Sequence, residues 1–312
     1  MDIVALARLG LIAANQQIDL STLQSFAHIR SNDLMAKSVL ITGCSSGIGY
    51  ALAREFKANG LRVFATARKA ESLTELASHG IEPLSLEVTS EDSIKALVAE
   101  VTSRTNGRLD LLVNNAGRNY TIPALDVDIE EIRETFETNL FAVMRMCQAF
   151  APLLIEAKGT IVQIGSLAGV MPYVFGSVYN ASKAALHSYS DTLRVELAPF
   201  RVRVVTVVTG GVRSNISRTH RTLPQDSIYL PLTEEYEARQ THSQANAIPN
   251  EQYATSVVRQ ILGSSKDTIW EGGKSWLVWT IYCFFPRWVM DMAMSRMFKL
   301  WKLRSGAKAK VM

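Results

Sequence analysis

The chain has 312 residues, of which 47% are hydrophobic and 20% charged, and this composition excludes a disordered chain. Its three cysteines, Cys44, Cys147 and Cys283, lack the spacing of a disulfide framework or a zinc site, which favours a reducing, cytoplasmic compartment and no bound metal. The net charge of +4 comes from the C-terminal end, because residues 286–312 carry seven Lys and Arg against one acid. The charges of the other residues sum to −2, so we do not expect the body of the protein to bind nucleic acid.

The first 34 residues differ in character from the rest of the chain. Their apolar segment, residues 3–14, is preceded by Asp2, interrupted by Arg8 and short, so it fits neither a secretory signal nor a membrane span. We expect residues 1–34 to be an N-terminal extension, either an ordered amphipathic segment or a dispensable leader.

Residues 35–272 alternate between short apolar runs and helix-length segments. The runs predict strands at residues 39–42, 62–66, 81–88, 109–113, 160–164, 202–208 and 268–270. A helix is expected over residues 48–58, ending at Asn59 and Gly60. This alternation predicts the α/β class: a Rossmann-type, doubly wound parallel sheet forming a single domain, with residues 273–312 as a C-terminal tail.

A glycine-rich turn follows the first predicted strand. Gly43, Gly47 and Gly49 would let backbone amides approach phosphate oxygens, while the next helix directs its positive N-terminus at them. A plain tight turn is the alternative for such a triad alone. The strand before it and the helix after it favour a dinucleotide site.

The end of the second strand selects the cofactor. An acid there would bind the ribose hydroxyls of NAD, but this chain has Arg68, whose guanidinium suits a 2′-phosphate. NADPH is therefore the expected cofactor, with a solvated arginine as the alternative. Asn115, Ala116 and Gly117 follow the fourth strand, where small residues would let the backbone run along the nicotinamide ribose; a simple turn is the other interpretation.

Tyr179 and Lys183 lie four residues apart in a predicted helix over residues 176–197. At this spacing an ammonium would stabilise the phenolate and lower the pKa of the tyrosine, making it an acid near neutral pH. In an arbitrary helix the same pair would be a surface contact. The glycine turn upstream, and Ser166 after the fifth strand, favour the catalytic interpretation.

With these motifs in this order (TGxxxGIG, NNAG, Asn139 in Thr-Asn-Leu, Ser166 and YxxxK), residues 37–272 resemble the short-chain dehydrogenase/reductase family. The resemblance implies Tyr179 as proton donor to a carbonyl and Ser166 as the hydroxyl that orients it. It also implies that Lys183 binds the nicotinamide ribose and Asn139 holds a relay water. The residues expected to contact the cofactor are Gly43, Ser45, Ser46, Gly47, Ile48, Gly49, Arg68, Glu87, Val88, Asn115, Ala116, Gly117, Tyr179, Lys183, Val212 and Ser214.

Two segments depart from the family pattern. Residues 209–214 lack the usual Pro-Gly, so we expect a looser nicotinamide loop in which Ser214 still offers a hydroxyl to the carboxamide. Glu87-Val88 stands where an aspartate usually meets the adenine, which makes the adenine contacts less defined than the phosphate contacts.

Residues 211–249 lie where this family places its substrate lid. Five cationic or titratable side chains there could meet a phosphate-bearing substrate, or could be a solvated basic surface. They are Arg213, Arg218, His220, Arg221 and Arg239.

All five tryptophans lie in the last 43 residues. The uncharged run at residues 275–285 is too short to span a bilayer of about 30 Å. Beyond Pro286 we expect an amphipathic helix with Met290, Met294, Met297 and Trp301 on one face and a basic face opposite. Such a tail favours a membrane surface; the alternative is a lid over the active site or a homodimer contact. It also makes the chain resemble fungal 1-acyldihydroxyacetone-phosphate reductases and related reductases of fungal secondary metabolism.

We therefore expect NADPH-dependent reduction of a ketone on an apolar, lipid-like or polyketide-derived substrate, at a cytoplasmic location peripheral to the endoplasmic reticulum or lipid droplets. An alcohol dehydrogenase oxidising retinol-like or steroid-like substrates is the alternative within the enzyme class. A redox-sensing binding protein without turnover is the alternative outside it, but such proteins typically lose the tyrosine or the lysine.

Overall fold

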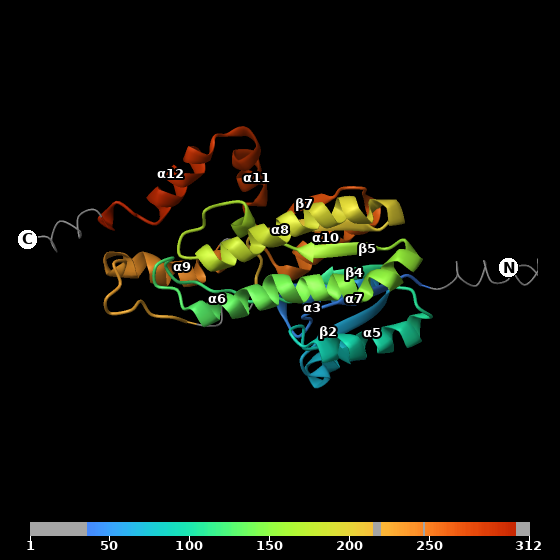
Figure 1. Cartoon of the computed structure of the whole chain (residues 1–312). Helices are drawn as coiled ribbons and strands as arrows, with labels where there is room; N and C mark the ends of the chain where they lie inside the picture. Colours follow the sequence, from blue (N-terminus) through green and yellow to red (C-terminus); the bar gives the residue numbers. More distant parts are fainter. Residues whose placement is uncertain (1–35, 215–219, 246, 304–312) are drawn as a thin grey trace, which may run out of the picture. The chain divides into compact units, whose positions relative to one another are not determined.

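The computed structural model of the chain describes residues 36–214, 220–245 and 247–303 (Figure 1). The predicted extension at residues 1–34, and the end of the tail at residues 304–312, lie outside this description. The residues from Lys37 onward form one compact unit, in agreement with the prediction of a single domain.

Seven strands form one sheet in which every neighbouring pair is parallel. Their order is β3-β2-β1-β4-β5-β6-β7, so the predicted doubly wound sheet is confirmed. The strands are β1 (Ser38–Ile41), β2 (Arg62–Ala67), β3 (Glu82–Ser85), β4 (Leu111–Asn114), β5 (Thr160–Ile164), β6 (Arg203–Thr209) and β7 (Thr268–Glu271).

The side on which the chain adds successive strands changes at β1. Strands β2 and β3 lie on one side of β1, and β4 to β7 lie on the other. Ile41 of β1 is in register with Ala65 of β2 on one side and with Val113 of β4 on the other. Ligands of such sheets bind outside the carboxyl ends of the strands at this reversal. The crevice above β1 and β4 is therefore where the predicted glycine turn and Asn115 should meet.

Helices cover both faces of the sheet. On one face α3 and α10 bury Phe56 and Tyr253 against strand residues such as Val39; on the other, α5, α7 and α8 bury residues such as Phe150 against Leu112. The helices are α3 (Gly47–Ala58), α4 (Thr74–Ser78), α5 (Glu91–Thr105), α6 (Ile129–Phe136), α7 (Ala142–Ala157), α8 (Ser177–Leu197), α9 (Thr233–Ala245), α10 (Asn250–Gly263), α11 (Ser275–Phe284) and α12 (Arg287–Met297).

One strand is shorter than predicted. The apolar run at residues 81–88 gives only β3, because the chain turns away from β2 after Leu86. The backbone NH of Glu87 donates to Ser93 Oγ at 2.9 Å, and the Glu87 carboxylate accepts from the Thr89 hydroxyl at 2.9 Å. These polar contacts form the turn into α5 and outweigh the apolar character of Leu86 and Val88.

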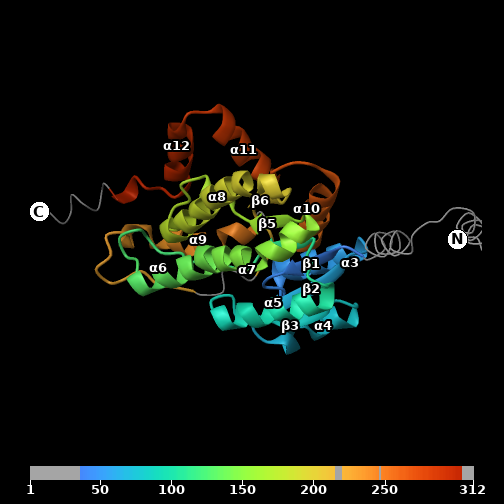
Figure 2. The ribbon, with the colours of Figure 1, turned by 45° about the vertical axis from the view of Figure 1, so that its right-hand side comes forward.

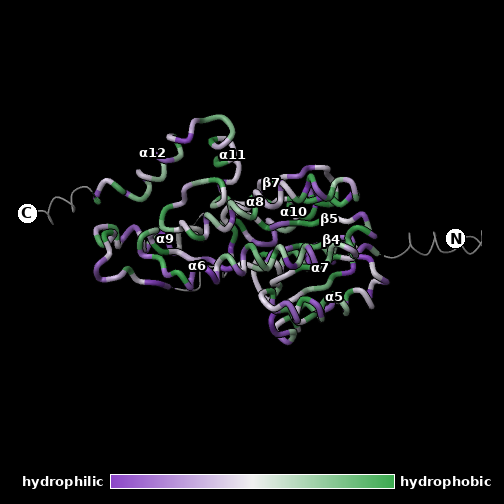
Figure 3. Tube along the Cα trace, viewed as in Figure 1, coloured by the Kyte–Doolittle hydropathy of each residue, from purple (hydrophilic) through white to green (hydrophobic). Residues whose placement is uncertain are grey.

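The tail forms two helices outside the three layers, drawn in red in Figures 1 and 2. Pro286 separates α11 from α12. Val278, Met290 and Met294 are buried in a cluster with Tyr236 of α9, so the tail packs on the body of the protein. Figure 3 shows hydrophobic residues in the central strands and again in α11.

The predicted amphipathic tail helix is only partly correct. Helix α12 ends at Met297, and Lys299 has the left-handed φ of 48°, so the helix does not continue to Trp301. Lys299 and Lys302 do not form a free basic face, because both ammonium groups bind the Glu235 carboxylate of α9, at 3.0 and 2.8 Å.

Among the described residues, one continuous helical stretch, residues 129–157, is long and apolar enough to cross a membrane. Its second half is α7, whose apolar side chains, including Phe150 and Leu154, are buried against the sheet. This stretch therefore serves as a core helix of the domain.

Candidate active site

The turn between β1 and α3 depends on its glycines. Gly43 and Gly47 adopt left-handed φ angles of 72° and 63°, which L side chains rarely adopt. A Cβ on Gly49 would stand 2.4 Å from the carbonyl oxygen of Gly43. The glycine triad is therefore required by the backbone path, and Gly43 and Gly47 line the cavity.

The segment after β4 is fixed to this turn by side chains. Asn115 donates from Nδ2 to the carbonyl oxygens of Thr42 and Gly43, at 2.8 and 3.1 Å. The Thr42 hydroxyl in turn accepts from the backbone NH groups of Asn115 and Ala116, both at 2.9 Å. The two predicted cofactor segments thus form one rigid floor.

Arg68 lies at the end of β2 as predicted, exposed at the rim of the same cavity. Glu87 and Val88 also line this rim, but the Glu87 carboxylate already accepts from the backbone NH and hydroxyl of Thr89. The arginine is therefore the charged group at this end that remains available to a ligand phosphate.

The loop after β6 is not loose, contrary to the expectation from its missing Pro-Gly. Gly210 donates to the Glu271 carbonyl at 2.7 Å, and Gly211 and Gly273 exchange two hydrogen bonds. The two backbones approach so closely that a Cβ on Gly210 would meet the Gly273 oxygen at 2.5 Å. Glycines in the segments after β6 and β7 thus replace the rigidity that a proline would give, and Val212 and Ser214 line the cavity.

The four predicted catalytic side chains come from three different parts of the fold. Ser166 follows β5, Tyr179 and Lys183 are on α8, and Asn139 lies in a π-helical turn, Glu137–Phe141, between α6 and α7. π-turns of this kind are frequent at functional sites because they redirect a side chain. Ser166, Tyr179 and Lys183 line the cavity together.

Asn139 and Lys183 are held in place by backbone groups. Asn139 accepts from the backbone NH of Arg118 at 2.9 Å, and it donates to the Arg118 carbonyl and to Ser182 Oγ, both at 3.0 Å. Lys183 Nζ donates to the Ile164 carbonyl at 2.8 Å and lies 5.9 Å from the centre of the Tyr179 ring.

The expected lowering of the Tyr179 pKa by Lys183 is not found. Burial raises the pKa of Tyr179 above its ordinary value, and the opposing influences come from the Ser166 hydrogen bond and the charge of Arg239. Burial also lowers the pKa of Lys183 to about 8. The phenol is therefore kept protonated, as a proton donor requires, and the ammonium is the group that titrates near neutral pH.

His187, on α8, was not predicted. Its Nε2 accepts from the Ser166 backbone NH at 3.3 Å, and burial, with the charge of Lys183, lowers its pKa to about 4, so the ring is neutral. Cβ atoms on Gly165 and Gly169 would approach the ring to 2.2 and 2.7 Å. The signal in the sequence was these two glycines flanking Ser166, which make room for the imidazole.

Gly43, Gly47, Arg68, Asn115, Ser166, Tyr179 and Lys183 line one cavity of about 1080 Å³, whereas Gly49, Asn139 and His187 lie behind its wall. One end has the glycine turn and Arg68, and the catalytic side chains lie further along. The wall beyond them is apolar and comes largely from the tail: Leu277, Val278, Ile281, Met290, Ala293, Met294 and Met297. Because the volume slightly exceeds the usual range for one small-molecule site, about 300–1,000 Å³, and the glycine cradle suits a pyrophosphate, the residues fit a dinucleotide with a second, apolar ligand.

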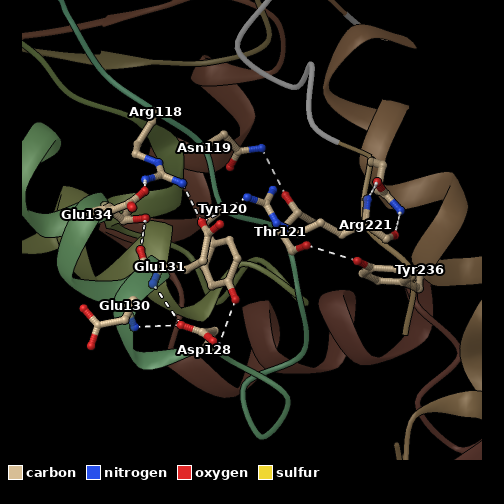
Figure 4. Close-up of polar contacts among 12 residues, drawn as sticks. Arg118, Asn119, Tyr120, Thr121, Asp128, Glu130, Glu131, Glu134, Arg221 and Tyr236 are labelled. Atoms are coloured by element: carbon tan, nitrogen blue, oxygen red, sulfur yellow. Dashed lines mark hydrogen bonds and ion pairs between the residues drawn. The ribbon is translucent and has the colours of Figure 1, made fainter. Parts of the chain in front are cut away.

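The expected lid cations have different environments. Arg221 lies over the Tyr120 ring and binds the Glu131 carboxylate at 3.0 Å (Figure 4). Arg118 binds Glu131 and Glu134 in the same network. Arg213 and His220 are exposed, and Arg218 lies outside the described residues. Arg239 is 3% exposed and lines the cavity.

The family model for short chain dehydrogenases matches residues 37–224 of this sequence. The chain belongs to the short chain dehydrogenase family. The match covers the glycine turn, Asn139, Ser166 and the Tyr179–Lys183 pair, whereas Arg239, the segment at Glu271 and Gly273, and the tail lie beyond it.

Relatives in the same family extend the similarity beyond that range. The short-chain dehydrogenase fogD of Aspergillus ruber is 43% identical over 281 residues, which cover 89% of this chain and 98% of the relative. The NADPH-dependent 1-acyldihydroxyacetone phosphate reductase of Saccharomyces cerevisiae is 38% identical over 283 residues, covering 88% and 95%.

Solved short-chain dehydrogenases have the same fold. A member from Streptomyces avermitilis aligns with a TM-score of 0.70 at 30% identity, covering 87% of this chain and 98% of the other. A member from Burkholderia cenocepacia, solved in complex with NADP, gives 0.67 at 25% identity, covering 83% and 98%.

Within residues 36–214, 220–245 and 247–303, no group of three or more His, Cys, Asp or Glu side chains is placed to hold a metal ion. Cys44 and Cys147 are buried thiols whose pKa values are raised by burial, to about 12 and about 11, so neither is a thiolate.

Proposed function

We propose that the protein is a reductase that uses NADPH to reduce a ketone on an apolar, lipid-like or polyketide-derived substrate. NADP(H) is its cofactor, and when bound the nicotinamide supplies the hydride. One observation carries the proposal: the protonated Tyr179 lies in a cavity whose floor fits a dinucleotide and whose far wall is built from apolar tail side chains.

Each catalytic side chain has a role that its contacts support. Tyr179 donates its phenolic proton to the carbonyl oxygen of the ketone, and Ser166 orients that oxygen from the other side. Lys183, held by the Ile164 carbonyl, directs its ammonium at the ribose hydroxyls of the cofactor. Asn139 links the loop at Arg118 to Ser182 of α8, and its role in the proposal is to hold a relay water next to Lys183.

The relatives support the cofactor and the type of substrate. The Saccharomyces cerevisiae relative is named as an NADPH-dependent reductase of 1-acyldihydroxyacetone phosphate, a ketone with an acyl chain. Arg68 is the exposed cation where the cofactor's 2′-phosphate is expected, at the end of β2.

A panel of ketones with increasing apolar chain length, read by NADPH absorbance, tests the function. We expect turnover with NADPH and a KM for NADH that is higher by about 10- to 100-fold, the worth of one strong charge-assisted contact. Arg68→Ala should remove this preference, whereas Arg54→Ala, an exposed arginine on α3, should keep it. Equal use of both cofactors by the unaltered protein would refute the NADPH assignment.

We also propose that the outer surface of the tail binds a lipid bilayer. Trp276 and Phe284 of α11 are 70% and 69% exposed, and Trp288 of α12 is 61% exposed. Aromatic side chains of this kind favour the headgroup region of membranes. The location we propose is therefore cytoplasmic, peripheral to the endoplasmic reticulum or lipid droplets; the homodimer stays a prediction.

Sedimentation with phosphatidylcholine–phosphatidylserine liposomes tests the membrane proposal. Replacing Trp276 and Phe284 by serine should release the protein into the supernatant. The matched control replaces Leu125 and Val195, which are 74% and 64% exposed but lie outside the tail, and it should remain bound. Equal binding of both variants would move the contact surface elsewhere.

A further inference from the structure

Arg239 of α9 is a buried cation at the wall of the active-site cavity. Its guanidinium carbon lies 3.6 Å from the centre of the Tyr173 ring, and its Nε donates to the Val174 carbonyl at 3.2 Å. A Cβ on Gly176 would stand 3.4 Å from its Nη2, so the glycine leaves space for the fork. Tyr173, Arg239 and Tyr179 all line the cavity.

Among the residues that the structure describes, no carboxylate forms an ion pair with this guanidinium. Its described hydrogen bond uses only Nε, which leaves the Nη donors for a ligand. Burial lowers the pKa of Arg239, which reflects the cost of holding a charge there, and an uncompensated buried charge is strongly destabilising.

The neighbouring lid arginine shows the contrast. Arg221 is bound by the Glu131 carboxylate and hydrogen-bonded through its backbone to Gln240 (Figure 4), so its charge is already satisfied. Arg213 is exposed and does not line the cavity. Of the lid cations that the structure describes, Arg239 alone combines burial, an unused donor fork and a position in the cavity.

We propose that Arg239 binds an anionic group of the substrate, a phosphate monoester or a carboxylate, placed near the ketone. This inference rests on the proposed reductase function and specifies its substrate: an amphiphile whose charged end meets Arg239 while its chain lies against α11 and α12. The planar fork pairs with two oxygens of such an anion, and the Tyr173 ring fixes the plane of the fork.

The binding of the anion would decide which carbonyl reacts. Because Arg239 and Tyr179 line the same cavity, an anion held by the arginine keeps the attached carbonyl near the proton donor. An apolar chain alone can slide along the methionine-rich wall, whereas the anion fixes its position. Arg239 is therefore a specificity-determining residue, and Tyr179 remains the proton donor.

The test uses three ketones with the same alkyl chain, ending beside the carbonyl in a phosphate, a carboxylate or a hydroxyl group. The unaltered protein should favour at least one anionic ketone over the hydroxyl ketone in kcat/KM by about 10- to 100-fold. Arg239→Gln should lose most of this ratio, and Arg239→Lys, which keeps the charge but not the fork, should be intermediate. Arg213→Gln, the exposed control, should keep the full ratio.

Binding in the unaltered protein provides a readout that needs no variant. Octyl phosphate or octanoate should compete with the ketone at least tenfold better than octanol, and the stronger of the two identifies the anion. The inference is overturned if octanol competes equally well. It is also overturned if Arg239→Gln lowers kcat/KM for all three ketones by the same factor with a shifted pH profile, because the arginine would then act on Tyr179 alone.

These experiments distinguish a failure of the Arg239 proposal from a failure of the proposed reductase function. If no ketone of any class is reduced with NADPH, the reductase proposal fails. If the hydroxyl ketone is reduced with the same kcat/KM as the anionic ketones, the reductase proposal is retained and the proposed role of Arg239 is rejected.

Discussion

The carboxyl edge of the sheet and the tail after β7 line the same cavity but are built differently. At the edge, Asn115 and Lys183 are fixed by hydrogen bonds to backbone carbonyls of the central strands and their connections. The tail makes its contacts through apolar side chains such as Met294, and through one ion cluster at Glu235. The edge is a rigid part of the core, whereas the tail is a peripheral layer.

The difference assigns the chemistry to one region and the selection of substrate to the other. A proton donor must be held to within fractions of an ångström, which a hydrogen-bonded sheet edge provides. An apolar chain needs only a surface of suitable area and shape, which Ile281 and Met297 can offer without directional bonds. Changes at the edge should therefore abolish the reaction, and changes in the tail should alter which substrate reacts.

The largest expected effect is at the edge. Tyr179→Phe removes the proton donor but leaves the ring, so turnover should fall by about 10²- to 10⁴-fold with NADPH affinity nearly unchanged. Steady-state NADPH oxidation and NADPH fluorescence titration measure the two quantities. Tyr189→Phe, on the same helix but packed against the apolar core and not in the cavity, is the control and should stay active. An unchanged rate in Tyr179→Phe would reassign the acid.

The pH dependence of the reaction should follow the titration of the Lys183 ammonium at the sheet edge. Its pKa is lowered to about 8 by burial, so its ammonium is lost as the pH rises through 8. The value of kcat/KM for NADPH should then fall about tenfold per pH unit above 8. Tyr179 contributes no such limb in this range, because burial raises its pKa.

The variant Lys183→Arg tests whether the loss of activity above pH 8 belongs to Lys183. Arginine keeps its charge throughout the range, so the limb near pH 8 should disappear even though the longer side chain reduces the overall rate. A limb that persists at the same pH in Lys183→Arg would belong to a different group.

The tail should change the substrate range instead. Met297→Ala removes apolar surface from the cavity wall, and KM for a long-chain ketone should rise roughly 3- to 10-fold with kcat retained. KM for a short-chain ketone should barely move. Met292→Ala is the matched control, because Met292 is on the same helix but does not line the cavity. Equal effects on both chain lengths would mean that the wall does not contact the chain.

The smallest effect concerns how the tail is attached. Burial alone would raise the pKa of Glu235, but hydrogen bonds from Lys302 and Lys299 outweigh it and lower the pKa to about 2. Glu235→Gln should reduce the free energy of unfolding by about 1–3 kcal/mol at pH 7. Chemical denaturation measures it, and Glu234→Gln, whose side chain is 87% exposed, should change it by less than about 0.5 kcal/mol.

The sign of the pH effect at Glu235 is set by the lowered pKa. The stabilisation is fully present above the ordinary carboxyl value near 4.5 and is lost as the pH falls towards 2. The difference between the unaltered protein and Glu235→Gln should therefore shrink over this interval. A difference that is constant down to pH 2 would mean that the ion cluster does not stabilise the tail.

The same contrast explains what the sequence could predict. The sheet, Gly43 and the Tyr179–Lys183 spacing were predictable, because backbone geometry and helix periodicity restrict which residues can stand there, whereas Asn139 was named only through the family resemblance. The extent of β3 was not, because polar contacts around Glu87 and Thr89 ended the strand against the apolar pattern.

The tail and the lid were less predictable for a physical reason. Their contacts are long-range and apolar, and a methionine that faces a cavity has no sequence pattern that distinguishes it from one facing water. The basic residues after α12 predicted a charged face, yet Lys299 and Lys302 turn towards Glu235, more than 60 positions earlier in the chain. Arg239 could be named as a candidate, but its lack of a partner required the fold.

The position of α11 and α12 after the last strand has a consequence for how this protein can change. No strand or catalytic loop passes through residues 275–297, so this hairpin can be exchanged for that of a relative without rethreading the sheet. Chimeras joined near Gly273 would then inherit substrate choice from the donor and reaction chemistry from the recipient, which makes the hairpin a natural unit of diversification.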